Sequence, residues 1–227
     1  MVVIGKYVPQ LQFLNILLGD EPGLAPQMRL YQRLVAANRE EADEIVDDFL
    51  KEKDLPAVYD ELLIPTLVLA EMDAIEGNLS KERHTYLLES VREIAEECAD
   101  RMDQKKEDHQ LLSSTDLKLL CLPARTVGDE ISALLFARLS AMLPHIQASH
   151  LSATSLLNEM LDQVKELNPD IICICSLSPS AVSKARYALT RIQARFQNVQ
   201  VPSVYGRLGT GWRRRKNAWN LQERASC

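Results

Sequence analysis

The loop PARTVG, residues 123–128, has the residue types in this sequence that best suit ligand chemistry. It follows an apolar run and precedes a segment that we expect to be helical, so Arg125 would lie at a strand end beside a helix N-terminus. A guanidinium and free backbone N–H groups placed there can hold an anion such as a phosphate or a carboxylate. The alternative is an exposed or ion-paired arginine in an ordinary loop.

Two further loops are expected at the same edge of the predicted sheet. SLSPS at 176–180 and YGRLGTG at 205–211 also follow runs that we predict to be strands. In open α/β sheets, ligands bind beyond the carboxyl ends of the strands. We therefore name these candidate ligand-binding residues: Arg125, Thr126, Gly128, Ser176, Ser178, Ser180 and Gly206.

Catalytic signatures are missing from the sequence. It contains no P-loop, no nucleophile elbow and no GxGxxG motif, and the glycines of 206–211 follow the last predicted strand instead of the first. The helical half has no Glu-x-x-His pair, which a di-metal bundle would need. Asp129 and Glu130 are explained by their favourable interaction with a helix dipole. We therefore expect no enzymatic activity, no catalytic residue and no metal site.

Composition, charge and cysteine content limit the partners that this chain can bind and the cellular compartment in which we expect it. The chain is 46% hydrophobic and 26% charged, as is typical of a soluble globular protein. Residues 27–110 carry 22 acidic and 11 basic side chains, a balance that repels phosphates and argues against a nucleic-acid partner. The 5 cysteines form no CxxC pair, so we expect buried, reduced thiols in a reducing compartment. No segment has the roughly 20 apolar residues of a membrane span.

The first half of the chain is expected to be helical. Apolar stripes at helical spacing predict four amphipathic helices over residues 27–103, and short connections between them indicate a four-helix bundle. Asn38 would cap the second helix. Pro65 would kink the third helix, and Gly77 would end it.

The second half, residues 116–211, is expected to be an α/β domain. Continuous apolar runs at 117–123 and 170–177 are typical of strands buried on both faces of a parallel sheet. Further strands are predicted at 145–151 and 199–206, and helices at about 126–143, 153–167 and 180–197. This alternation predicts a doubly wound, mostly parallel, Rossmann-like (flavodoxin-like) sheet of about four strands. The fold class is therefore α + α/β.

Three segments flank or join these halves: an apolar head at 1–26, a polar linker at 104–115 and a basic tail at 212–227. The tail contains no strand-like run, and we expect it to be solvated. Without another strand, residues 199–204 would form an exposed sheet edge, and exposed edges pair with other chains. We therefore predict a homodimer.

The order of bundle, linker and doubly wound domain resembles the cobalamin-binding module of methionine synthases and corrinoid sensors. The segments at 41–80 and 121–135 carry the likeness. In that family a DxHxxG loop supplies a histidine that ligates cobalt, with the aspartate behind it. Aligned on Gly128, the histidine position is Arg125 and the aspartate position is Pro123. Because a guanidinium cannot donate a lone pair to a metal, we expect no cofactor; cobalamin is the alternative, since some relatives bind it without the lower histidine.

The helical half departs from the sensors too. They carry a tryptophan three residues before the glycine that ends the third helix, and a Glu-His pair after that glycine. The corresponding positions here are Ala74, His84 and Thr85. We expect His84 to be a surface residue of its helix.

A second resemblance also includes the head. GKYVPQLQFLNILLGDEP, RLYQRLVAANREEADEIVDDFLKE and CLPARTVGDE are similar to the cytoplasmic C-terminal extension of predicted permeases of the autoinducer-2 exporter family. This implies a non-catalytic regulatory or assembly role at the cytoplasmic face of the inner membrane, with the permease portion of the same protein as partner. The alternative is a ligand sensor that binds cobalamin or a small anionic molecule between bundle and sheet.

Overall fold

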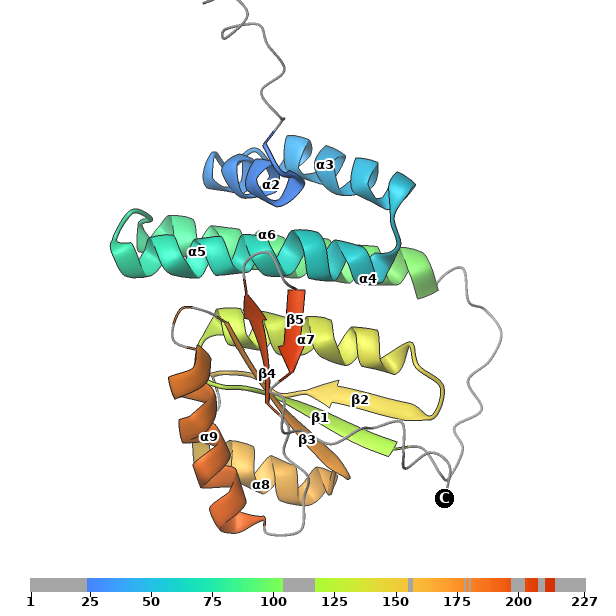
Figure 1. Ribbon diagram of the computed structural model, residues 1–227, viewed down its shortest axis with the longest axis vertical. Helices are drawn as coiled ribbons and strands as arrows, with labels where there is room; N and C mark the ends of the chain where they lie inside the picture. The colour runs from blue at the N-terminus through green and yellow to red at the C-terminus, as the bar shows by residue number, and fades with distance from the viewer. Residues whose placement is uncertain are drawn as a thin grey trace, which may run out of the picture.

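The computed structural model describes residues 24–103, 117–154, 157–177, 179 and 181–196, and the backbone of 203–207 and 211–214. The predicted head up to residue 23, the linker, Ser178, Ser180 and the tail from residue 215 lie outside the described residues. The chain is layered: a helical half lies above an α/β half, and helix α7 (Val127–Ala141) lies between them (Figure 1).

The helical half consists of α2 (Pro26–Val35), α3 (Arg39–Glu52), a helix running from Leu55 to Glu76, and α6 (Lys81–Asp103). The Asn38 side chain accepts the Glu41 N–H at 3.2 Å and caps α3, as the sequence predicted. Gly77, with φ of 78°, ends the third helix, as predicted. A left-handed residue at this position favours glycine because it has no Cβ.

The third helix contains a wide turn directly before Pro65. It starts as α4 (Leu55–Ala57), continues as the π-helical turn η2 (Val58–Leu63) and ends as α5 (Ile64–Glu76). Pro65 has no N–H to donate to the preceding turn. The Ile64 N–H bonds to the Tyr59 carbonyl, five residues back, which is the π-helical pattern. The distortion predicted at the proline is thus a π-helical turn.

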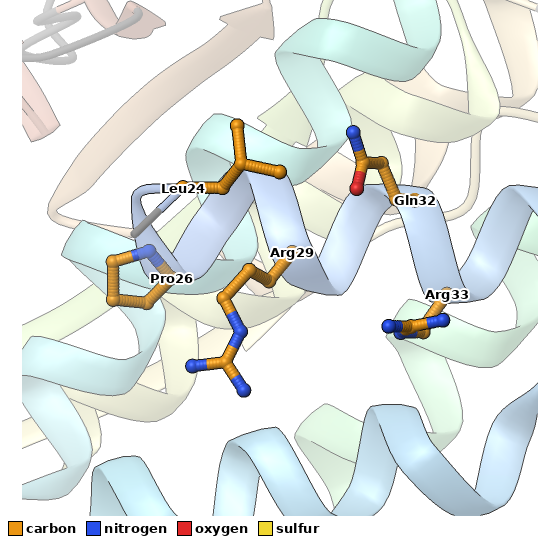
Figure 2. A pocket seen from close by; sticks show the side chains of 5 residues that line it. All are labelled: Leu24, Pro26, Arg29, Gln32 and Arg33. Atoms are coloured by element: carbon orange, nitrogen blue, oxygen red, sulfur yellow. The ribbon is translucent and has the colours of Figure 1, made fainter. Parts of the chain in front are cut away.

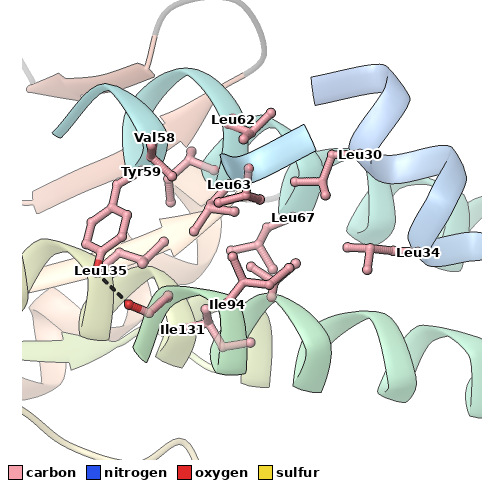
Figure 3. Packing of buried hydrophobic residues seen from close by; sticks show 14 of the residues in the cluster. Leu30, Leu34, Val58, Tyr59, Leu62, Leu63, Leu67, Ile94, Ile131 and Leu135 are labelled. Atoms are coloured by element: carbon pink, nitrogen blue, oxygen red, sulfur yellow. Dashed lines mark hydrogen bonds between the residues drawn. The ribbon is translucent and has the colours of Figure 1, made fainter. Parts of the chain in front are cut away.

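The two halves share a hydrophobic core. Tyr59 is fully buried among the leucines of the bundle, and its hydroxyl donates to the Ala95 carbonyl at 2.8 Å. Ile131 and Leu135 of α7 pack into the same cluster (Figure 3), as does Leu177. Full burial of such a side chain contributes roughly 1.5–3 kcal/mol, so the bundle and the sheet stabilise each other.

The sheet contains β1 (Leu117–Pro123), β2 (Ile146–His150), β3 (Ile171–Leu177), β4 (Ser203–Arg207) and β5 (Gly211–Arg214), in the order β2-β1-β3-β4-β5. The first four are parallel, and β5 is antiparallel to β4. Helix α7 covers one face, and α8 (Leu157–Leu167) and α9 (Ala181–Arg195) cover the other (Figure 1). The predicted parallel α/β half after a helical half is confirmed.

Strand β5 corrects the prediction that the tail contains no strand. Its sequence, GWRR, lacks the apolar run of a buried strand, and an edge strand needs none because one side faces solvent. Strand β4 begins at Ser203 and lies between β3 and β5. The exposed edge that motivated the homodimer is therefore covered. Dimerisation stays a prediction, which light scattering would test.

None of the helices within the described residues is both long and apolar enough to cross a bilayer.

Candidate functional site

The candidate site lies where α7 begins, at the carboxyl edge of the sheet. The Thr126 hydroxyl accepts the Asp129 N–H at 3.1 Å, and the Asp129 carboxylate accepts the Thr126 N–H at 3.0 Å. This reciprocal capping box fixes the start of the helix. The local sequence TVGD therefore determines where the Asp129 side chain lies.

The Asp129 carboxylate is fully buried and surrounded by donors. Its Oδ2 also accepts the Arg125 N–H at 3.0 Å, and its Oδ1 accepts the Leu177 N–H at 2.8 Å. The Ser176 hydroxyl lies 3.4 Å from Oδ1, and the Lys184 ammonium lies 3.6 Å from Oδ2. One carboxylate thus joins the loop after β1, the end of β3 and the first turn of α9.

These contacts change the interpretation of the predicted anion site. The backbone N–H groups of Arg125 and Thr126, which were to hold an external anion, are bound to Asp129. The Arg125 side chain is exposed, and in the described part of the chain no hydrogen bond or ion pair of its guanidinium is found. Arg125 is therefore an exposed cation, and the N–H groups that were expected to assist it are already bound to Asp129.

The structure places the remaining candidate ligand-binding residues in different parts of the chain. Thr126, Gly128 and Ser176 come together with Arg125 around Asp129. Gly206 lies in β4, where it pairs with Leu177 and with Trp212 of β5. Ser178 and Ser180 lie outside the described residues.

Glu130 forms a second buried carboxylate node. It accepts the Ala153 N–H at 2.7 Å, the Ser152 hydroxyl at 2.8 Å and the Arg92 guanidinium at 2.8 Å. Burial alone would raise the pKa of Glu130, but these donors outweigh it and leave the pKa below its ordinary value. Because Arg92 belongs to α6, this node ties the bundle to the first turn of α7.

A third contact joins α5 to the same turn. The Glu71 side chain is 7% exposed, and its Oε1 lies 3.3 Å from Nε2 of His84. A Cβ at Gly128 would lie 2.6 Å from Oε1 of Glu71 and 3.2 Å from Cδ1 of Leu177. A side chain at position 128 would therefore push Glu71 away from this contact between bundle and loop. His84, expected to be a surface residue of its helix, keeps a side chain that is 23% exposed, and its Nε2 faces Glu71.

Three buried polar atoms at these contacts have no hydrogen-bond partner among the described residues: Oε1 of Glu71, Nε2 of His84 and Nζ of Lys184. Sequence reasoning missed Glu71 and Lys184. Glu71 carried a signal, because it lies in the run IPTLVLAEM, four residues after the buried Leu67, on the apolar face of its helix. The sequence around Lys184 carried no such signal, because only the fold brings helix α9 close to Asp129.

The fit of a corrin ring can be tested on these contacts. A ring held between bundle and sheet needs a gap there, yet Glu71 touches Gly128 and Arg92 bonds to Glu130 across that boundary. Arg125, the exposed side chain of this loop, is a guanidinium and has no lone pair to offer a metal. The residues present do not fit a corrin ring in this arrangement.

Surface hollows lie on other elements. One is lined by Leu24, Pro26, Arg29, Gln32 and Arg33 at helix α2 (Figure 2). Arg33 also pairs with Glu41 of α3 at 2.9 Å, so part of its charge is compensated. No residue of the carboxyl edge contributes to this hollow.

No protein-family model matches the chain, and no curated protein does. Solved structures similar to it include the methanol:cobalamin methyltransferase complex MtaBC from Methanosarcina barkeri, with 14% sequence identity over 88% of this chain and 77% of that chain and a TM-score of 0.37. A cobalamin-binding protein from Desulfitobacterium hafniense DCB-2 is similar at 15% identity over 78% of this chain and 80% of that chain, with a TM-score of 0.35.

Proposed function

We propose that this chain is a non-catalytic regulatory or interaction domain whose ligand-binding edge is closed by its own carboxylates. The observation that carries the proposal is the buried Asp129 carboxylate, which accepts the N–H groups of Arg125, Thr126 and Leu177. In an α/β domain that binds an anion at this edge, such N–H groups would face the ligand. An external anion would have to displace a carboxylate whose hydrogen bonds are each worth about 1.5–3 kcal/mol.

The bundle is expected to act together with the sheet. Arg92–Glu130 and the Glu71–Gly128 contact connect two helices of the bundle to one turn of α7. A partner that shifts α5 or α6 would therefore change the packing of α7 on the sheet. This coupling supports a domain that transmits binding instead of one that converts a substrate.

The proposed location of this domain in the cell rests on the resemblance of its sequence to the C-terminal extension of predicted permeases. We propose that it belongs to a permease, at the cytoplasmic face of the inner membrane, where it regulates transport or assembly. The permease portion of the same protein is the proposed partner.

An immunoblot of fractionated cells tests this attachment. An antibody against this chain is expected to detect a band in the membrane fraction that is larger than 25.6 kDa, because the permease portion adds mass. Deleting the region from the native gene should leave the remaining protein in the membrane and change its transport rate or its oligomeric assembly. A soluble band at 25.6 kDa would contradict the attachment.

A second candidate function is a sensor of a small anion. It is favoured by the exposed Arg125 guanidinium and by the Lys184 ammonium, which is buried without a hydrogen-bond partner beside Asp129. A thermal-shift screen with inorganic phosphate and nucleotides tests it, with Arg125→Ala as control. If the Asp129 carboxylate closes this edge, as proposed above, these ligands should cause no shift in Tm. A rise in Tm that Arg125→Ala abolishes would establish the anion sensor instead.

The cobalamin form of the sensor has its own test. The full chain is incubated with cobalamin and passed through a gel-filtration column, and its visible spectrum is recorded. We expect no corrin band to elute with the protein. A retained band would show that the bundle and the sheet can separate around the ring.

A further inference from the structure

Three cysteine thiols lie together beneath helix α7. Cys121 of β1 and Cys173 and Cys175 of β3 are 0%, 1% and 0% exposed. All three pack in the cluster that includes Ala133 and Ala137 of α7, so their side chains point to the same face of the sheet. None of the cysteines in the described part of the chain forms a disulfide.

The strand register selects one pair of these thiols. Cys121 is the register partner of Cys173 across the parallel β1–β3 pair. Neighbouring strands lie roughly 4.8 Å apart, within the range of about 4.4–6.8 Å between the Cα atoms of a disulfide. Cys175 pairs in register with Pro123, one step further along, and Cys98 belongs to the core of the bundle.

The surroundings of Cys121 favour its reactive form. Hydrogen bonds from the Cys173 and Cys175 side chains lower the pKa of the Cys121 thiol, against the opposing effect of burial. The thiolate is the form of cysteine that attacks oxidants. His150 is the register partner of Cys121 on the other side, in β2. Burial lowers the pKa of His150, so its imidazole is neutral near pH 7 and can accept a proton.

We propose that Cys121 and Cys173 form a dithiol site that hydrogen peroxide oxidises to a disulfide between β1 and β3. The Cys121 thiolate attacks one peroxide oxygen, the O–O bond breaks, and the departing hydroxide takes up a proton to give water and a Cys121 sulfenic acid. The Cys173 sulfur then attacks the Cys121 sulfur, the S–O bond breaks, and the second oxygen leaves as water with the Cys173 proton. Two thiols are oxidised, and one peroxide is reduced to two waters.

Burial makes this site selective for a small oxidant. Hydrogen peroxide is close to water in size, whereas aromatic disulfide reagents and oxidised glutathione cannot pass beneath α7. His150 is half-buried and is the register partner of Cys121, so we expect peroxide to enter from the β2 side of the cluster. The native chain should therefore react with peroxide and resist the bulky reagents.

The test treats the full chain with hydrogen peroxide, alkylates the remaining thiols in denaturant and maps the peptides by mass spectrometry. We expect a linked pair of peptides containing Cys121 and Cys173, lighter by two hydrogen atoms than the reduced pair. Cys175→Ala should form the same link more slowly, because one hydrogen bond to Cys121 is lost. Cys173→Ala should form no Cys121–Cys173 link and should leave a Cys121 sulfenic acid that dimedone traps when it is added together with the denaturant.

Three results would overturn the proposal. One is the absence of the link at a peroxide concentration that oxidises the urea-unfolded chain. Another is a link that joins other cysteines. The third is an aromatic disulfide reagent modifying Cys121 as fast as peroxide does, because the thiols would then react only through unfolding. If Cys173→Ala does not fold, as judged by circular dichroism, the peptide map of the unsubstituted chain still decides.

Discussion

The Asp129 carboxylate accepts the backbone N–H of Leu177 at 2.8 Å, although the two residues are 48 positions apart in the chain. Asp129 lies in the first turn of the helix after β1, and Leu177 ends β3, so the contact joins two neighbouring strands of the sheet. The other oxygen of the same carboxylate binds the loop before α7. A helix-capping residue thus also occupies the edge where ligands of α/β domains bind.

Asp129→Asn should destabilise the chain by about 2–3 kcal/mol, measured by urea denaturation. An amide has one acceptor oxygen, so its NH₂ group would face either the Leu177 N–H or the N–H groups of the loop, donor against donor. Lys184 would also lose its counter-charge. Glu44→Gln is the control, because Glu44 is exposed on α3; its effect should stay within about 0.5 kcal/mol. Equal effects at the two positions would contradict the role of Asp129.

Gly128→Ala should have a more favourable effect on the free energy of unfolding in a Glu71→Ala background than in the unsubstituted chain. The difference should be about 1 kcal/mol or more. Alanine raises intrinsic helix stability by about 1 kcal/mol over glycine, but here its Cβ meets Glu71 Oε1 at 2.6 Å. Shortening Glu71 removes this collision. A urea-denaturation cycle of the four variants measures the coupling.

Gly77→Ala provides the matched control for this cycle. Gly77 has φ of 78° and nothing within 4 Å of an added Cβ, so the cost of alanine is backbone strain alone. Its destabilisation should be the same with and without Glu71. If Gly128→Ala shows no coupling to Glu71 either, the close contact between bundle and loop is not significant.

Arg92 and Glu130 should couple by about 1 kcal/mol in a double-mutant cycle of Arg92→Ala and Glu130→Gln. Their contact joins α6 to α7, and Glu130 is 6% exposed, although the 30% exposure of the Arg92 side chain reduces the gain by solvent screening. The control is Arg101–Asp47, a 2.6 Å pair whose side chains are 54% and 49% exposed. That pair should couple by less than about 0.5 kcal/mol. Similar coupling in the two cycles would refute a special junction at α7.

The free energy of unfolding should fall as pH is lowered from 7 toward 5.5, and His150→Gln should reduce this slope. Burial lowers the pKa of His150 in the folded chain, whereas the unfolded chain protonates it near a pH of about 6.5. Between those pKa values the unfolded state binds more protons, so acid favours unfolding. Urea titrations at several pH values measure the slope. An unchanged slope in His150→Gln would mean that His150 is not responsible.

Much of the fold could be predicted from local patterns. The apolar runs located β1 and β3, because strands buried on both faces need continuous apolar residues. Asn38 and Gly77 marked helix ends because capping depends on adjacent residues. Strand β5 was missed because an edge strand of four residues carries no such pattern.

The site was harder to predict than the fold. Arg125, Thr126, Gly128 and Ser176 were expected at one edge of the sheet, and the structure brings them together around Asp129, since parallel strands end at the same edge. The partners of Asp129 and Glu130 were not foreseen, because a carboxylate in a first turn is equally well explained by the helix dipole. His84 was assigned to the surface because its own helix is polar around it, and Glu71 comes from a different helix.

The sequence by itself determined the order of the helices and of the first four strands, and the capping box at Thr126, because each depends on residues within one or two turns. Only the tertiary structure decided that Asp129 faces Leu177, that Glu71 rests on Gly128 and that three thiols share one face beneath α7. These are contacts between segments far apart in the chain. Their existence depends on how the elements pack, which no local spacing of residues records.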